Sequence, residues 1–181
     1  MVIPHHDPFA TALIAHLPRL RSYATALVGS TSAADDLVQD CLERALRRGV
    51  TLQDPQRMAG WLRSILFNLY VDLMRARRIQ AGIDIVQMDN DLALSTPPED
   101  RAGAIDFMRA LRSLSLEHRQ ILLLVGLEGL SYREVACELG VPVGTVMSRL
   151  ARARDRLRNV LEQEIELTPD RRSLAGRRAE Q

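Results

Sequence analysis

Lysine is missing from this chain of 181 residues, and all 24 of its basic residues are arginine. Aromatic residues make up only 4% of the sequence, and the strict polar–apolar alternation that is typical of strands is missing as well. Leucine, alanine, arginine and glutamate dominate instead, which predicts an all-α fold. We attribute the exclusive use of arginine to a GC-rich genome and draw no functional conclusion from it.

Few residues are suited to catalysis or to metal binding. Cys41 and Cys137 stand among apolar neighbours, so we expect both to be buried thiols in a reducing cytoplasm. The four histidines have no metal-ligand spacing, and the sequence contains no nucleophile constellation or phosphate loop. We therefore expect no enzyme activity, no cofactor and no metal.

Long apolar runs are also missing. No stretch of 18 apolar residues occurs, and the N-terminus lacks a basic segment followed by an apolar one. The sequence therefore predicts a cytoplasmic protein with neither secretion nor membrane insertion.

A helix-turn-helix pattern is the most informative feature that is present. Ser131 and Glu134 have the spacing of a capping box, which predicts the start of a short helix. Gly140 is expected to end that helix, with Val141 at the cap and Pro142 at the first position of the next one. The short turn predicts two helices that cross steeply, as in DNA-binding proteins.

The second helix of this pattern is amphipathic and basic. Its expected packing stripe comprises Val143, Val146, Leu150, Ala153 and Leu157. Its expected outer face comprises Thr145, Ser148, Arg149, Arg152 and Arg156. Between 142 and 160 there are five arginines and one acid, a charge of 5 − 1 = +4. Such a face suits phosphates, and an arginine fork also fits the O6 and N7 atoms of guanine.

The formal net charge of +1 conceals three charged blocks. Residues 57–78 hold five arginines and one aspartate, residues 79–100 hold five acids and no base, and 142–160 is the basic block described above. Two basic blocks thus flank an acidic spacer, which predicts two nucleic-acid surfaces on one chain.

The first domain is expected to span 8–79 and to contain three helices. We expect the first to run from about Pro8 to Leu27 with Ile14 inward, and the second to start at Ser32. The third should follow the Asp54–Pro55 cap and extend to about Ile79. Its expected core residues are Met58, Trp61, Leu62, Ile65, Leu66, Leu69 and Leu73. Asp35 and Asp36 would lie in the first turn of the second helix.

The rest of the chain is expected to form a linker, a second domain and a tail. Residues 80–102 have the composition of a flexible linker, and 166–181 that of a disordered tail. The second domain should span 103–165 and begin with an amphipathic helix that buries Phe107. A helix capped by Ser115 then precedes the helix-turn-helix.

Four motifs in order resemble a known family. Asp36–Ala45 (DLVQDCLERA) and Gly60–Asp72 (GWLRSILFNLYVD) resemble regions 2.2 to 2.4 of bacterial sigma factors. Ser115–Gln120 with Glu128–Tyr132 resembles region 4.1, and Gly144–Leu150 (GTVMSRL) resembles region 4.2. The chain is identified as similar to extracytoplasmic-function (ECF, group 4) RNA polymerase sigma factors of the sigma-70 family. The phrase LVGLEGL at 124–130 resembles their general-stress branch.

This resemblance implies a subunit that binds core RNA polymerase and directs it to promoters. Its region 2 would be a three-helix bundle and its region 4 a helix-turn-helix domain. Asp36, Gln39 and Asp40 would contact the clamp helices of the β′ subunit, although Asp40 stands where the family usually has Glu. Region 4 would meet the β flap. From the residues alone, a solvated acidic face is an alternative for these three positions.

The resemblance also implies two contacts with promoter DNA. Asn68 would contact the melted −10 element, with phosphates held by Arg75, Arg77 and Arg78. Thr145, Ser148, Arg149, Arg152 and Arg156 would contact the −35 element. Met147 and Ala151 depart from the residues common in the family, which leaves the base contacts open.

Two further functions are alternatives to a promoter-specificity subunit. A sigma-like decoy would bind an anti-sigma protein without binding DNA, and an ordinary helix-turn-helix repressor would need a ligand or dimerisation domain. Both basic blocks are intact, which disfavours the decoy, and a repressor leaves the first domain unexplained. Since no sensory domain is recognisable, the resemblance also implies control by an anti-sigma factor.

Overall fold

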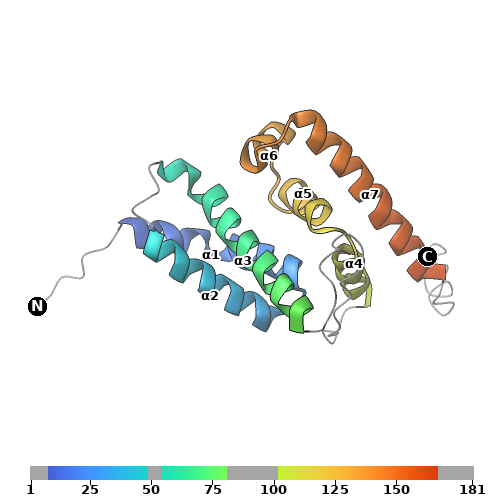
Figure 1. Cartoon of the computed structure of the whole chain (residues 1–181), viewed down its shortest axis with the longest axis horizontal. Helices are drawn as coiled ribbons and strands as arrows, with labels where there is room; N and C mark the ends of the chain where they lie inside the picture. The colour runs from blue at the N-terminus through green and yellow to red at the C-terminus, as the bar shows by residue number, and fades with distance from the viewer. Residues whose placement is uncertain (1–7, 49–53, 81–101, 167–181) are drawn as a thin grey trace, which may run out of the picture. The chain divides into compact units, whose positions relative to one another are not determined.

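The structure is a computed structural model that describes residues 8–48, 54–80 and 102–166, and the regular structure in these ranges is helical (Figure 1). The described helices form two compact units, as the sequence predicts. The first contains α1 (Pro8–Val28), α2 (Thr31–Arg48), a 3-10 turn η2 (Pro55–Arg57) and α3 (Met58–Gln80). The second contains α4 (Ala102–Arg112), α5 (Leu116–Gly126), α6 (Tyr132–Leu139) and α7 (Val143–Glu166). Most of the expected linker and tail, residues 81–101 and 167–181, lies outside the described ranges.

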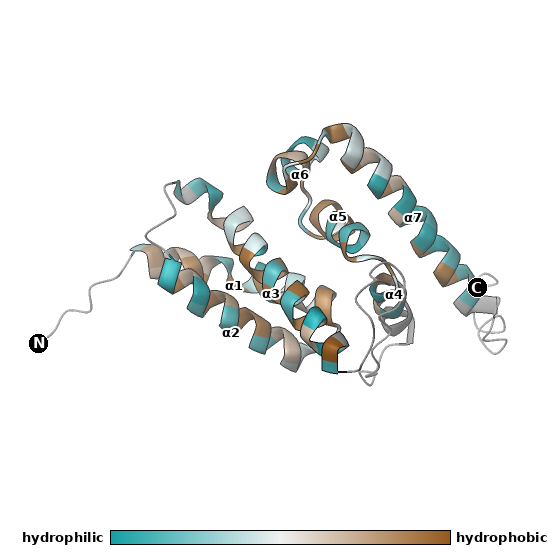
Figure 2. Ribbon diagram, viewed as in Figure 1, coloured by the Kyte–Doolittle hydropathy of each residue, from teal (hydrophilic) through white to brown (hydrophobic). Residues whose placement is uncertain are grey.

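The first unit is a three-helix bundle in which each helix packs against the other two. Figure 2 shows hydrophobic and hydrophilic residues mixed along each of these helices, as an amphipathic pattern requires. The buried residues of α1 and α2 are Leu13, Leu20, Tyr23, Ala24, Leu27, Ala34, Leu37, Val38, Cys41 and Ala45. Ile14, which we expected inward, is 65% exposed. It lies roughly 100° around the helix from Leu13, beyond the edge of the buried stripe.

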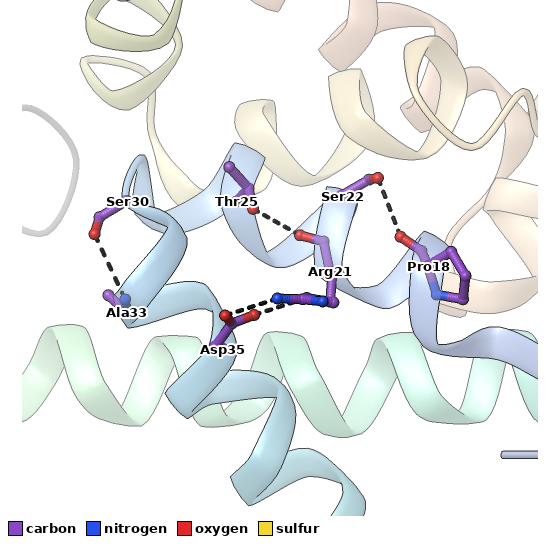
Figure 3. A network of polar contacts seen from close by, with 7 residues as sticks. All are labelled: Pro18, Arg21, Ser22, Thr25, Ser30, Ala33 and Asp35. Atoms are coloured by element: carbon purple, nitrogen blue, oxygen red, sulfur yellow. Dashed lines mark hydrogen bonds and ion pairs between the residues drawn. The ribbon is translucent and has the colours of Figure 1, made fainter. Parts of the chain in front are cut away.

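Pro18 lies inside α1, a position that usually interrupts helical hydrogen bonding. Proline cannot donate to the carbonyl four residues earlier, and that residue is Ile14 on the exposed side of the helix, where water can serve instead. The next turn carries two side-chain contacts with the backbone: Ser22 Oγ donates to the Pro18 carbonyl at 3.1 Å, and Thr25 Oγ1 to the Arg21 carbonyl at 2.8 Å (Figure 3). The helix therefore continues through the proline.

The second helix starts earlier than the sequence predicts. Its cap is Ser30 and not Ser32, because the Ser30 carbonyl accepts from Ala34 N at 3.0 Å and its hydroxyl from Ala33 N at 3.5 Å. Asp35 and Asp36 consequently lie beyond the first turn, where the helix dipole has little effect. A different interaction involves Asp35: Arg21 Nε and Nη2 donate to its two carboxylate oxygens at 2.7 and 2.8 Å, joining α1 to α2 (Figure 3). This pairing raises the pKa of Arg21.

The third helix begins after an Asp54 cap, as predicted. Asp54 Oδ1 accepts from Gln56 N at 2.9 Å, and η2 precedes the α-helical turns. The core residues of α3 are Met58, Leu62, Ile65, Leu66, Tyr70 and Met74. The buried ridge thus continues at i+4 spacing to Tyr70 and Met74, whereas the expected Leu69 and Leu73 are only half-buried. The half-buried Trp61 packs edge to face on Phe9 with ring centroids 6.3 Å apart.

In the second unit, α7 packs against α4 and α6. The buried residues are Ala110, Leu111, Leu114, Ile121, Leu123, Leu124, Val135, Ala136, Val146, Leu150 and Ala153. Phe107, predicted to lie in this core, is 45% exposed, whereas Ala110 and Leu111 further along α4 are buried. The predicted Ser115 cap is confirmed, since the Ser115 carbonyl accepts from Arg119 N at 2.9 Å.

Arg119 is buried in the second unit and holds the end of α4. Its Nε donates to the Leu111 carbonyl at 3.0 Å, and its Nη2 donates to the carbonyls of Arg112 and Leu114, the latter at 3.1 Å. The last carbonyls of a helix have no partner within it, so this guanidinium acts as a C-terminal cap supplied by α5. These contacts fix the corner between α4 and α5. No local sequence pattern predicts this role of Arg119.

Candidate nucleic-acid interface

The first helix of the helix-turn-helix is capped as the sequence predicts. Ser131 has an extended backbone (φ −66°, ψ 157°), and its side chain accepts from Glu134 N at 3.3 Å. Glu134 Oε2 accepts in return from Ser131 N at 2.8 Å. This reciprocal capping box fixes where α6 begins.

A tight turn leads from α6 into α7. Gly140 adopts the left-handed conformation at φ 66° and ends α6, as predicted, and Val141 N donates to the Ala136 carbonyl at 3.1 Å. The Pro142 carbonyl accepts from Thr145 N at 2.9 Å and from Val146 N at 3.2 Å. Pro142 is therefore the cap residue of α7 and not its first helical residue. The predicted start of this helix is one residue too early, because a proline without an N–H fits either place.

The inner side of α7 is buried along the middle of the predicted stripe. Val146, Leu150 and Ala153 are fully covered, whereas Val143 is 38% exposed and Leu157 half-buried. Three consecutive contacts at spacings of four and three hold the helix on its unit. The residues on the opposite side are exposed or half-buried.

The predicted DNA-binding residues of α7 lie outside this buried stripe. Ser148, Arg152 and Arg156 are exposed, and Thr145 and Arg149 are half-buried. Ser148 Oγ donates to the Thr145 carbonyl at 3.1 Å, which still leaves its lone pairs available. The arginines recur at 149, 152 and 156, so one side of the helix carries a row of cations about one turn apart.

An acid from α5 reaches this arginine row. Arg149 Nη2 lies 3.1 Å from Glu117 Oε2, and the two side chains form an ion pair. Burial lowers the pKa of the neighbouring His118; Glu117 opposes this shift, and Arg149, Arg152 and Arg156 add to it. The first turn of α5 therefore faces the arginine row. Sequence analysis missed this contact because Glu117 and Arg149 lie on different helices and no local pattern links them.

The predicted −10 residues on α3 do not all share one face. Asn68 and Arg75 are exposed and seven residues apart, which places them on one side of the helix, with Asp72 Oδ1 4.0 Å from Arg75 Nη1. Arg77 is exposed but lies about half a turn away, in line with the buried Tyr70. The side chain of Arg78 lies outside the described part of the structure.

The acidic residues of α2 share one exposed side. Asp36, Gln39 and Asp40 are all exposed and lie opposite the buried stripe of the helix. Gln39 Nε2 donates to Glu43 Oε1 at 3.3 Å, which extends this polar surface by one turn. The surface carries three carboxylates, of which Glu43 pairs with Arg47 at 3.5 Å, and the exposed Asp36 and Asp40 are open to a basic partner.

Neither thiol belongs to a metal or catalytic cluster among the described residues, where no group of three or more His, Cys, Asp or Glu side chains occurs that could hold a metal ion. Cys41 is buried, as predicted; its Sγ donates to the Leu62 carbonyl at 3.5 Å, and burial raises its pKa to about 12. Cys137 is exposed, which contradicts the prediction that both thiols are buried. It lies on the solvent side of the short helix α6, next to the buried Val135 and Ala136.

Within the described ranges, every helix is too short or too polar to cross a membrane.

The fold and this surface define a class: a helical protein of two units, one of which carries a helix-turn-helix with a basic second helix. Two family models match the chain. "Sigma-70, region 4" matches residues 104–157, and "Sigma2 domain of PhyR" matches residues 13–68. The two matches correspond to the second and the first unit.

Curated proteins and solved structures give the same family. The chain is 36% identical over 163 residues to the ECF RNA polymerase sigma factor EcfG of Rhodopseudomonas palustris, covering 88% of each chain. It is similar in structure (TM-score 0.68, 32% identity) to the sigma factor RpoE of Bartonella quintana, solved in complex with the anti-sigma factor NepR, covering 85% of this chain and 96% of that one. The chain belongs to the ECF group of the sigma-70 family of RNA polymerase sigma factors, which are not enzymes.

A third likeness shows the fold alone. The anti-anti-sigma factor PhyR of Bartonella quintana, complexed with NepR, matches at a TM-score of 0.50 and 20% identity over 82% of this chain and 48% of that one.

Proposed function

We propose that this sigma factor binds core RNA polymerase and directs it to promoters of a stress response. The observation that carries the proposal is the capped helix-turn-helix, whose second helix leaves an arginine row open to solvent. Residues 8–79 are the domain that meets the polymerase and the −10 element. Residues 103–165 are the domain that meets the −35 element, with 80–102 as the linker and 166–181 as a tail.

The −35 element is read by α7. Arg149 and Arg152 contact guanine edges in the major groove, while Thr145, Ser148 and Arg156 contact phosphates or neighbouring bases. The support is that Arg152 and Arg156 are exposed and Arg149 is half-buried, all outside the buried stripe of the helix. Because Met147 is 54% exposed beside these residues, an apolar contact with a thymine methyl group belongs to the same surface.

The −10 element is bound by α3. Asn68 offers a donor and an acceptor to one unpaired base, and Arg75 on the same face holds an adjacent phosphate. Arg77 and Arg78 bind phosphates further along the strand, since Arg77 does not share the face of Asn68. Trp61 has no part in base stacking here, because its ring packs against Phe9.

The polymerase docks on the acidic side of α2. Asp36, Gln39 and Asp40 present carbonyl and carboxylate oxygens to the clamp helices of the β′ subunit, and the second domain meets the β flap. The support is the shared exposure of these three residues on one helical side.

Run-off transcription tests the proposal. Core polymerase from the same bacterium is mixed with the purified chain and with genomic promoter fragments. We expect transcripts of defined start sites only when the chain is present. Tight, sequence-specific DNA binding by the free protein, with no effect on core polymerase, contradicts the proposal.

An anti-sigma factor holds the protein inactive. The support is that the related RpoE was solved with such a partner, NepR. One partner that contacts both domains hides the polymerase and DNA surfaces together. Affinity purification from unstressed native cells is expected to yield that complex. Recovery of the protein free or bound to polymerase, with its target promoters fully active, contradicts this regulation.

A sigma-like decoy is the second candidate, because the first unit matches the sigma2 domain of PhyR. A decoy binds the anti-sigma protein and needs no DNA surface, so its arginine row has no function. The run-off assay separates the two functions: a decoy yields no transcript with core polymerase and still binds the anti-sigma partner.

A further inference from the structure

One of the two arginines proposed to read a base, Arg149, is paired with an acid from a different helix. Arg149 Nη2 and Glu117 Oε2 form an ion pair at 3.1 Å, and both residues belong to the second unit. The side chain of Arg149 is 31% exposed and that of Glu117 is 64% exposed, so the pair lies at the surface and is open to DNA. The exposed Arg152 and Arg156 continue the row along α7.

The helix dipole does not account for this contact. An acid in the first turn of α5 is favoured by the dipole wherever its side chain points. Here the side chain reaches across to α7. Arg149, Arg152 and Arg156 also contribute to the lowered pKa of His118, the next residue on α5, which agrees with the position of this turn near the row. Glu117 is therefore an acid that lies beside three arginines, and these arginines would otherwise be free to bind DNA phosphates.

We propose that Glu117 is a positioning residue that sets the base specificity of Arg149, an inference that rests on the function proposed above. A free arginine side chain has many rotamers, and holding it in one reduces the entropy lost on binding. The guanidinium has five N–H donors, of which a guanine edge needs two. Glu117 can thus stay paired with the guanidinium of Arg149 while two N–H groups of that guanidinium face the base.

The carboxylate also opposes contacts that carry no sequence information. A phosphate near Arg149 would meet the charge of Glu117, whereas the neutral edge of a guanine would not. Glu117 therefore weakens binding to any DNA slightly and strengthens the preference for one base. Loss of its charge should reverse both effects.

The experiment measures base preference in the holoenzyme. Core polymerase is reconstituted with the wild type, Glu117→Gln, Arg149→Ala, the double variant, or Asp155→Asn. Each holoenzyme selects from promoter fragments randomised in the upstream element, and affinities are then measured for the selected sequence and its single-base variants. Asp155→Asn is the matched control because Asp155, paired with Arg158 within α7 at 3.9 Å, loses the same charge without touching Arg149.

We expect Glu117→Gln to reduce the preference at the position that Arg149→Ala also affects, by about two- to fivefold, the range expected for one exposed ion pair. The double variant should lose no more than Arg149→Ala alone, and Asp155→Asn should keep the wild-type preference. An unchanged preference in Glu117→Gln, or an additional loss in the double variant, overturns the inference while leaving the proposed function intact. A wild-type holoenzyme without any upstream preference overturns both.

Discussion

Arg149 and Arg158 lie on the same helix but are expected to act differently on DNA. Arg149 is half-buried at the turn-proximal part of α7, where we propose that base edges are contacted, whereas Arg158 is exposed near the distal part and pairs with Asp155. Arg149→Ala should cost about 1 to 3 kcal/mol on the preferred promoter and relax the preference at one base. Arg158→Ala should weaken binding to all sequences alike. Holoenzyme titrations of single-base promoter variants distinguish the two patterns, and an unchanged base preference in Arg149→Ala contradicts its assignment.

His118 makes the stability of the second unit sensitive to acid. Burial and the nearby arginines keep its folded pKa below that of an unfolded chain, so the folded protein binds fewer protons. Stability is therefore fully present above the unfolded value of about 6.5 and falls as pH drops below it. We expect thermal unfolding between pH 7.5 and 5.5 to show a smaller loss of Tm in His118→Gln than in the wild type.

His16→Gln on α1 is the control for the loss of an imidazole. This variant should lose as much Tm on acidification as the wild type does. An equal acid response in His118→Gln and the wild type contradicts the role of His118.

At the scale of elements, the capping box of α6 determines how firmly the helix-turn-helix is held. Ser131→Ala removes the acceptor for Glu134 N and should lower the free energy of unfolding by about 0.5 to 2 kcal/mol. Ser148→Ala removes a hydroxyl that contacts only the backbone of its own helix at 3.1 Å, so it should be far less destabilising. Urea unfolding of the two variants tests this, and equal effects contradict a capping role for Ser131.

Helix boundaries were predictable where the signal is local. The Ser131 cap, the Gly140 stop and the Ser115 cap depend on residues within four positions of each other, and the sequence predicts all three correctly. The observed caps Ser30 and Pro142 differ by two residues and one residue from the predicted caps Ser32 and Val141. Both serines suit a helix cap, and a proline without an N–H suits either the cap or the first helical position. Local patterns thus predict that a helix is present but do not determine which residue is its first.

Contacts between elements were not predictable in the same way. Arg119 caps α4 from α5, and Glu117 holds Arg149 from another helix, so neither contact leaves a periodic trace in the sequence. Packing between helices also explains why α3 buries Tyr70 and Met74 and not the predicted Leu69 and Leu73. These two pairs lie on neighbouring ridges of the helix, and the contact with α1 and α2 decides which ridge is covered.

At the scale of the whole molecule, polymerase binding and folding are expected to be separable. Asp36 and Gln39 are exposed and contribute nothing to the core of the first unit, so changing both to Ala should weaken competition for core polymerase while leaving Tm nearly unchanged. Asp35→Asn is the matched control, because it removes a charge from the same helix at a carboxylate that pairs with Arg21. A double variant that competes for core polymerase as well as the wild type contradicts the docking surface on α2.

The two cysteines are expected to differ in reactivity, and this difference allows one of them to be labelled selectively. Cys41 is buried with a pKa of about 12, so it stays a thiol near neutral pH and resists alkylating reagents. Cys137 is exposed on α6, beside the helix that carries the arginine row. A maleimide dye should therefore label the natural sequence at one position, and its fluorescence would report when DNA or a protein covers the helix-turn-helix, without any engineered site.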